Sequence, residues 1–327
     1  MRFKQLLFTA LLLLSACTAK VDLDDSQSHF ALPDAHKQHA KLAAIAADNL
    51  SQQQLYNRTL SLWGTPYREL SFPTSLGTAH IIVSGPSDGE VLVLLHGMNA
   101  SSTMWYPNAA ALAEHYRIYA IDHILGTGKS EPSKPIESID QVINWYSEVF
   151  NQLQLKNINL VGASQGGWIA VNLALTDSTR VKSLALLSPA QTFTWMEPSS
   201  GIVANIWLAI NPNRENLSHA LDSMSSHVTD INPLYIDQFL NAMTTADLPK
   251  FLIDTQPFDD TQLQQLQMPT LVLIGDKDII NSNKSLDRAN ALLPKVKTKI
   301  INDAGHFLNV DQAAATNAAL QEFIDNL

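Results

Sequence analysis

The chain has 327 residues, of which 46% are hydrophobic and 16% are charged. That balance is too apolar for a disordered chain and too mixed for a bundle of membrane-spanning helices. The net charge of −10 comes without any run of Lys or Arg. The chain therefore lacks the electrostatic footprint of a nucleic-acid binder, and no nucleic-acid partner is expected. The length fits two domains, or one α/β domain with a large insertion.

The start of the chain has the pattern of a processing signal. Arg2 and Lys4 precede an apolar segment at residues 6–14. This segment, about nine residues long, is too short to cross a hydrocarbon core of about 30 Å as a helix, but it has the size typical of a signal peptide. The Leu-Ser-Ala-Cys sequence at 14–17 resembles the bacterial lipobox, and this resemblance implies that Cys17 is lipidated and becomes the first residue. An ordinary signal peptide that ends near a cysteine is the alternative.

Cys17 is the only cysteine, so no intramolecular disulfide and no two-cysteine metal site can form. Residues 1–16 carry two basic residues and no acidic one, so their removal changes the net charge from −10 to −12. An acidic body is not attracted to anionic lipid, and lipid on Cys17 would have to supply the membrane attachment. The resemblance implies a lipid-anchored protein of the bacterial cell envelope. Thr18 stands where inner-membrane lipoproteins tend to carry Asp, which favours the outer membrane in a Gram-negative organism.

Residues 17–39 are polar and without sustained periodicity, and we interpret them as a tether. His36 and His39 lie three positions apart, but no third metal ligand is nearby, so a solvated linker is the better interpretation. The Ala-, Leu- and Gln-rich segment at 40–62 has helical spacing and is expected to open the folded body.

Strands and helices alternate along the body. Short apolar runs predict strands at residues 79–83, 91–95, 117–121, 158–161, 181–187, 270–274 and 297–301. Helical patterns lie between most of them, at residues 108–115, 139–153, 168–175, 286–293 and 312–324. The first two strands are joined by a tight turn at residues 84–89. This alternation predicts an α/β fold whose mostly parallel sheet is covered by helices on both faces.

One long interval, between Pro189 and Met268, contains no convincing strand. It is too long for a loop in a compact domain, so it predicts an inserted, mainly helical subdomain. Its helix-like segments lie at residues 202–210, 216–225, 234–244 and 248–253. The expected organisation is a signal peptide at 1–16, a tether at 17–39, the first part of the core at 40–190, a helical cap at 191–267 and the second part of the core at 268–327.

The sequence Gly-Ala-Ser-Gln-Gly at 162–166 directly follows the predicted strand at 158–161 and precedes a helical pattern. This is Gly-x-Ser-x-Gly in the strand–turn–helix context that the motif requires. A nucleophile on so sharp a turn adopts a strained backbone conformation. The residues two positions to either side must then lack side chains, and Gly162 and Gly166 meet this condition. Ser164 is therefore the candidate nucleophile, and a chance loop serine is the alternative.

This motif resembles the α/β-hydrolase superfamily, and the sequence His-Gly-Met at 96–98 strengthens the resemblance. In that family, the residue after His-Gly and the residue after the nucleophile donate backbone N–H groups to the oxyanion hole. By position these are Met98 and Gln165. We interpret His96 as a structural histidine that packs the loop. The resemblance extends over residues 65–190 and 268–327, and the inserted segment matches the position of the family's cap.

The resemblance also implies the chain order serine, acid, histidine. Two acids, Asp276 and Asp278, follow the strand at 270–274, and the family pattern Gly-x-x-Asp favours Asp278. Asp276 is then expected to stabilise the turn through an Asx-type hydrogen bond. His306 follows the last predicted strand and a glycine, which matches the family's last triad position. Its neutral imidazole would accept the Ser164 proton, while Asp278 fixes the tautomer and stabilises the imidazolium.

The loop at 122–130 ends in Gly-Lys-Ser, the tail of a phosphate-binding loop, but His123 occupies the position of the required first glycine. An NTPase is therefore disfavoured. The loop instead resembles the family's Asp-x-x-Gly-x-Gly-x-Ser, with one extra residue before the first glycine. Candidate pocket residues are Asn99, Trp105 and the apolar side chains of the inserted segment, namely Trp195, Met196, Trp207, Met224, Tyr235, Phe239, Met243 and Phe251.

These residues predict a serine hydrolase that cleaves a small-molecule carboxylic ester through an acyl-enzyme on Ser164, without a metal or organic cofactor. Amidases, peptidases and acyltransferases of the family carry the same triad, so the substrate stays open. Dehalogenases and epoxide hydrolases are disfavoured because those relatives carry aspartate in place of Ser164. The alternative of another class is a catalytically silent, envelope-anchored binding protein that keeps only the hydrolase fold. The sequence makes no prediction of oligomeric state.

Overall fold

The computed structural model describes residues 50–211, 213–245, 249, 251 and 255–327. The predicted signal peptide, the lipidation site Cys17 and the tether lie outside these residues, as do the first part of the predicted helix at 40–62 and most of that at 248–253. No helix in the described part of the chain is long and apolar enough to cross a membrane.

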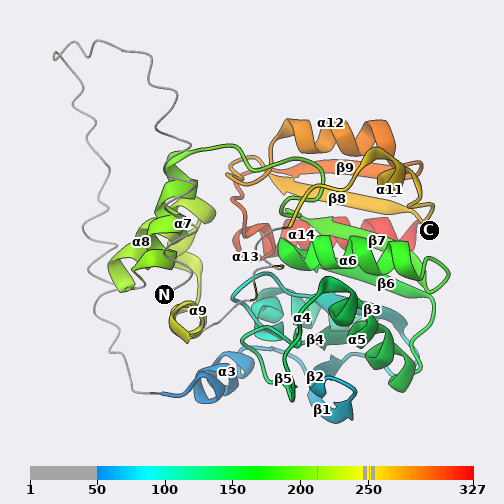
Figure 1. Ribbon diagram of the computed structural model, residues 1–327, viewed down its shortest axis with the longest axis horizontal. Coiled ribbons are helices and arrows are strands. Elements are labelled where there is room, and N and C mark those ends of the chain that lie inside the picture. The colour runs from blue at the N-terminus through cyan, green and yellow to red at the C-terminus, as the bar shows by residue number, and fades with distance from the viewer. Residues whose placement is uncertain (1–49, 212, 246–248, 250, 252–254) are drawn as a thin grey trace.

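A nine-stranded sheet forms the centre of the molecule (Figure 1). Its strands are β1 (Tyr67–Thr74), β2 (Gly77–Ser84), β3 (Glu90–Leu95), β4 (Tyr116–Ile121), β5 (Glu131–Pro132), β6 (Ile158–Ala163), β7 (Val181–Leu187), β8 (Thr270–Gly275) and β9 (Val296–Ile301). Their order across the sheet is β1-β2-β4-β3-β6-β7-β8-β9, and β5 pairs with β2. The strands from β4 to β9 along this order pair in parallel, whereas β2 is antiparallel to its neighbours. The prediction of a mostly parallel α/β sheet is confirmed.

Two features of the antiparallel edge of the sheet were not predicted from the sequence. The strands β2 and β3, although joined by a tight turn, are not neighbours, because β4 lies between them. The crossover from β3 places β4 beside it in parallel, and the free edge of β4 then pairs with β2. The edge strand β1 was not predicted, since its exposed and half-buried side chains and Pro73 give a weak apolar pattern.

Helices cover both faces of the sheet (Figure 1). The helices in the described part of the chain are α3 (Gln52–Leu60), α4 (Tyr106–Ala113), α5 (Ile139–Gln152), α6 (Gln165–Thr176), α7 (Ser200–Ile210), α8 (Arg214–Met224), α9 (Pro233–Thr245), α11 (Asp260–Gln264), α12 (Asn283–Leu292), α13 (Leu308–Asp311) and α14 (Ala313–Asp325), with short 3-10 helices η1 (Ser102–Trp105) and η2 (Val228–Asp230). In α5, Ser138 caps the N-terminus by accepting a hydrogen bond from the Gln141 N–H. Its buried residues Val142, Tyr146 and Val149 follow helical spacing and face the sheet.

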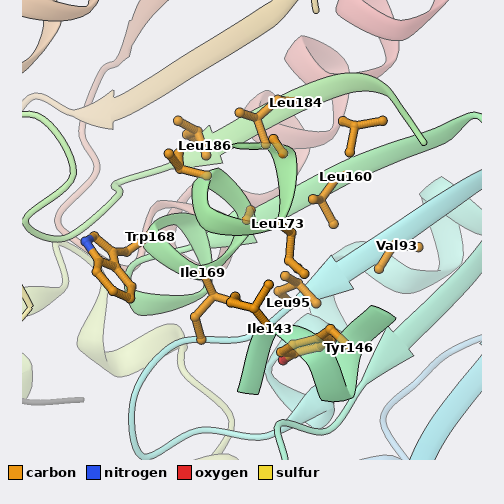
Figure 2. Packing of buried hydrophobic residues seen from close by; sticks show 14 of the residues in the cluster. Val93, Leu95, Ile143, Tyr146, Leu160, Trp168, Ile169, Leu173, Leu184 and Leu186 are labelled. Atoms are coloured by element: carbon orange, nitrogen blue, oxygen red, sulfur yellow. The ribbon is translucent and has the colours of Figure 1, made fainter. Parts of the chain in front are cut away.

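Alternating residues of the central strand β3 belong to two different hydrophobic cores. Val93 and Leu95 pack with α5 and α6 on one face, whereas Leu92 and Leu94 pack with α4 and α14 on the other. This follows from the period of two along a strand. Figure 2 shows the first core, in which side chains from the sheet meet Ile143, Tyr146, Trp168, Ile169 and Leu173.

The helices α7, α8 and α9 lie in the interval where the sequence predicts a helical insertion. They stand to one side of the sheet, and α7 packs against α8 while α9 packs against α3 (Figure 1). We call the described residues between 195 and 245, which include these three helices, the cap. Residues of the cap and of the loops that follow β3, β6 and β9 line one cavity, so the cap lies over the carboxyl ends of the parallel strands.

Candidate active site

Ser164 occupies the tight turn between β6 and α6 with φ 52° and ψ −119°, a conformation that side-chain-bearing residues rarely adopt. The two glycines of the motif are each required, because a side chain at either position would collide with a different part of the backbone. A Cβ at Gly162 would collide with the carbonyl oxygen of Gly166, and a Cβ at Gly166 would collide with that of Leu95. The close packing of β6, α6 and β3 therefore fixes the position of the serine.

The structure brings the three predicted triad residues together. His306 Nε2 lies 2.9 Å from Ser164 Oγ, and His306 Nδ1 lies 3.0 Å from Asp278 Oδ1. The side chains of His306 and Asp278 are buried. Because the three residues come from the turns after β6, β8 and β9, the parallel sheet delivers all of them to the same edge.

The environment of Asp278 keeps its carboxylate ionised. Burial alone would raise its pKa, but the charge and hydrogen bond of His306 more than offset this, together with the Ile280 N–H at 2.8 Å and the Asn281 amide at 3.0 Å. The net pKa is below its usual value. An ionised carboxylate only accepts hydrogen bonds, so the His306 proton resides on Nδ1 and Nε2 faces Ser164 as an acceptor.

Asp276, the alternative acid, lies outside the triad. Its Oδ1 accepts a hydrogen bond from the Ala304 N–H at 3.0 Å. The expectation that it stabilises its own turn through an Asx-type hydrogen bond is therefore wrong, because its partner lies on the loop after β9. The bond ties the loop carrying Asp278 to the loop carrying His306, an arrangement that only the pairing of β8 with β9 creates.

Met98 and Gln165 lie beside Ser164 on two different loops. Gln165 is the first residue of α6, at the positive end of the helix dipole. Met98 follows Gly97, where a Cβ would lie only 3.3 Å from the Ser164 Cβ, so the backbone at 97–98 passes directly against the serine. Both residues line the same cavity as Ser164 and His306.

His96 is buried and has two backbone partners. Its Nδ1 lies 2.9 Å from the Gly97 carbonyl oxygen, and its Nε2 accepts the His123 N–H at 2.9 Å. Burial lowers the pKa of His96, which keeps the imidazole neutral. The side chain ties the loop after β3 to the loop after β4, in agreement with the structural role expected from the sequence.

The Gly-Lys-Ser segment wraps around a buried carboxylate. Asp122 accepts hydrogen bonds from the Ser102 N–H and the Lys129 N–H, both at 2.8 Å, and lies 2.8 Å from His80 Nδ1. A Cβ at Gly128 would collide with this carboxylate, which explains the glycine. Burial would raise the pKa of Asp122, but His80 and the backbone donors lower it to about 2. The loop therefore closes around a carboxylate of its own chain.

The cavity at Ser164 measures about 320 Å³ and is mostly apolar. The cap contributes Met196, Asn205, Leu208, Met224, Tyr235, Phe239 and Met243 to it. Of the candidate pocket residues, Asn99 also lines the cavity, whereas Trp105 is fully buried elsewhere. Trp195 and Trp207 project into solvent instead.

Two residues that support the site have no signal in the sequence. Asp311 accepts hydrogen bonds from the Gly305 N–H at 2.8 Å and the Ser226 N–H at 2.9 Å, and thereby joins the His306 loop to the cap. Gln238 of α9 contacts the loop that follows Met98. Both connect positions far apart in the chain, which no local pattern reveals. Among the described residues, no group of three or more His, Cys, Asp or Glu side chains could hold a metal ion.

Comparisons with known proteins agree with the fold. The model of the alpha/beta hydrolase fold family matches residues 90–216 and 220–313. A Bacillus subtilis protein named uncharacterized carboxylesterase nap is 31% identical over 297 residues, which cover 88% of this chain and 96% of that protein. Carboxylesterase YbfK of the same organism is 31% identical over 287 residues, covering 86% and 96%. The crystal structure of naproxen esterase (carboxylesterase NP) from Bacillus subtilis has a TM-score of 0.77 at 32% identity and covers 85% of this chain and 100% of that one.

Proposed function

The chain belongs to the α/β-hydrolase family, and on that premise we propose that it hydrolyses carboxylic esters through an acyl-enzyme on Ser164. The observation that carries the proposal is the His306 imidazole, which lies within hydrogen-bond distance of both Ser164 and Asp278. Two carboxylesterases that share 31% of their residues with most of this chain support the ester as the bond that is cleaved.

Acylation begins when Ser164 Oγ attacks the ester carbonyl carbon while its proton passes to His306 Nε2. The carbonyl double bond opens, and the resulting oxyanion accepts hydrogen bonds from the backbone N–H groups of Met98 and Gln165. A single donor of this kind is worth about 3–4 kcal/mol of transition-state stabilisation in comparable enzymes. The tetrahedral intermediate collapses as the alcohol leaves with the proton from His306. Asp278 stabilises the imidazolium while it exists.

Deacylation repeats these steps with water. His306 takes a proton from a water molecule that attacks the acyl carbonyl, and the second oxyanion occupies the same site. Collapse releases the carboxylic acid and returns the proton to Ser164 Oγ. The carboxylate of Asp278 does not change protonation state at any stage. Every proton is thus transferred by a residue of the triad.

We further propose that the enzyme acts at the bacterial cell envelope, attached through lipid on Cys17. The support is the sequence at 14–17 and the apolar segment before it. The attachment is tested by expressing the full chain and its Cys17→Ser variant in a bacterial host and separating membranes from the soluble fraction. The wild type is expected in the membrane fraction, and the variant is expected in the soluble fraction. A wild type recovered without lipid contradicts the anchor and leaves the hydrolase proposal untouched.

The hydrolase proposal is tested with p-nitrophenyl esters of increasing chain length. We expect Ser164→Ala to lower kcat at least about 10⁴-fold, because the nucleophile and its proton transfer are lost together. Ser133→Ala, an exposed serine outside the cavity, is the matched control and should keep wild-type rates. Full activity in Ser164→Ala would exclude the proposed mechanism. A folded wild type that hydrolyses none of the esters would favour the silent binding protein.

A further inference from the structure

The cap helix α7 presents an apolar stripe to solvent. Val203, Ile206, Trp207 and Ile210 follow the i, i+3, i+4, i+7 spacing of one helix face. Such a face normally packs against a core, yet Val203 is 63% exposed and Trp207 is 55% exposed. Six of the ten large hydrophobic side chains that are exposed in the described part of the chain lie between residues 195 and 210.

The opposite face of α7 is committed to the fold and the active site. Leu208 is buried and lines the cavity at Ser164. Asn205 also lines the cavity, and its amide donates to the Ser223 hydroxyl of α8 at 3.0 Å. The stripe is therefore not an unpacked core face, because α7 already uses its other side for packing.

One of the exposed apolar side chains near α7 also lines the cavity. Met196 is 37% exposed and also lines the cavity. Met98, on the loop after β3, lines the cavity too. Trp195, next to Met196, is 60% exposed. We call Trp195, Met196 and the α7 stripe the cap patch. A partner that covers this patch would lie against the entrance to the active site.

The charge pattern of the patch indicates the chemistry of that partner. Residues 198–213 contain no charged side chain, in a chain whose net charge is −10. Tryptophan is enriched at the lipid–water interface, and binding there strengthens with the apolar area that is buried. The acidic body disfavours anionic lipid, so the apolar side chains must supply the attraction.

The first helix of the described residues packs against the cap. The described chain begins at residue 50, and α3 follows directly and packs against α9 of the cap. In this contact the Thr59 hydroxyl donates to the Leu234 carbonyl at 3.2 Å. A chain anchored at Cys17 would therefore enter the fold at its cap side.

We infer that the cap patch docks on a neutral phospholipid surface and presents the cavity entrance to esters dissolved in that lipid. This deepens the proposed function, on which it rests, by naming lipid-borne acyl esters as the substrate class. The docking itself requires only the exposed side chains and not the chemistry of Ser164.

Vesicle binding tests the inference without the lipid anchor. All helices and strands described above lie in residues 50–327, so removal of residues 1–16 together with Cys17→Ser leaves them intact. This protein is sedimented with phosphatidylcholine vesicles in a Ser164→Ala background. We expect binding that falls at least tenfold in the double variant Val203→Ser/Trp207→Ser. Tyr67→Ser, at an exposed site on β1, is the matched control and should bind like its parent.

A second arm separates docking from catalysis. In the Ser164 enzyme, Val203→Ser/Trp207→Ser should keep the wild-type kcat/KM on a soluble short-chain ester, since neither residue lines the cavity. Its rate on the same class of ester embedded in vesicles should fall at least tenfold.

Absence of vesicle binding by the parent, or equal binding by the double variant, would overturn the inference. Binding that requires anionic phosphatidylglycerol, or a dimer that the double variant abolishes, would also overturn it. Loss of all ester hydrolysis with vesicle binding intact would instead refute the proposed function.

Discussion

Thr103 and Gln238 are joined by a buried hydrogen bond of 2.8 Å that links the loop after Met98 to the cap. The Gln238 amide also donates to the Ser101 hydroxyl at 2.9 Å. The hydroxyl oxygens of Ser101 and Thr103 are 2.8 Å apart and form a third hydrogen bond. The three side chains thus form a closed ring with every member buried. Since Ser101 and Thr103 follow Met98 on the same loop, we expect the position of the proposed oxyanion donor to depend on Gln238 of the cap.

Replacing Gln238 by Leu should lower kcat about tenfold with a smaller change in KM, because a displaced Met98 N–H weakens binding of the transition state more than that of the substrate. The Ser101 and Thr103 hydroxyls keep each other but lose their hydrogen bonds to Gln238, which should cost about 1–3 kcal/mol of unfolding free energy. Steady-state kinetics and urea denaturation measure the two effects. In a double-mutant cycle with Thr103→Val the kcat losses should be strongly non-additive. Simple additivity would show that the ring does not act as a unit.

The two candidate acids give a direct comparison. Asp278→Asn should lower kcat about 10³–10⁴-fold, because an amide no longer fixes the His306 tautomer or stabilises the imidazolium. Asp276→Asn should stay within about threefold of wild type, since it loses only part of a loop hydrogen bond. Parallel kinetics of both variants on one p-nitrophenyl ester make the measurement. A reversed ranking would assign the triad acid to Asp276.

Asp122 should couple stability to acid pH. Its folded pKa of about 2 lies below the ordinary value of 3.8, so the folded state favours the ionised carboxylate. The resulting stabilisation is fully present above the unfolded pKa and is lost as pH falls through the folded pKa. At about 1.4 kcal/mol per pKa unit it amounts to about 2 kcal/mol. In urea denaturation between pH 7 and about pH 2, the unfolding free energy of Asp122→Asn should therefore fall less steeply with decreasing pH than that of the wild type. Parallel curves would contradict this assignment.

Phe239 should limit the length of the acyl group. It lines the apolar cavity from α9, so Phe239→Ala enlarges the space available to a longer chain. Each additional buried methylene contributes about 0.8 kcal/mol, and two of them would raise the kcat/KM ratio of octanoate to butyrate about tenfold. Tyr67→Ala, outside the cavity, should leave that ratio unchanged. An unchanged ratio in Phe239→Ala would place the acyl group elsewhere in the cavity.

The sequence predicts those parts of the site that depend on local context. Ser164 and Asp278 follow strongly apolar strands, and His306 follows the more polar strand β9. Their placement at one sheet edge follows from the parallel topology. The glycines around Ser164 are likewise predictable from the steric demands of the turn. All of these inferences rest on a few neighbouring residues.

The remaining features depend on pairings between distant segments. The Thr103–Gln238 hydrogen bond spans 135 positions, and the bond from Ser226 to Asp311 spans 85. The partner of Asp276 becomes predictable only when β8 and β9 are known to pair. For α7, the spacing identifies an apolar face but does not say whether that face is buried, and the structure places it in solvent.

The most direct test of the central claim is to label the protein, without residues 1–16 and with Cys17→Ser, with a fluorophosphonate probe and locate the adduct by peptide mass spectrometry. The account predicts one adduct, on Ser164, that is absent from the Ser164→Ala variant. Labelling of another serine, or no labelling of the folded protein, would contradict the assignment of Ser164 as an activated nucleophile.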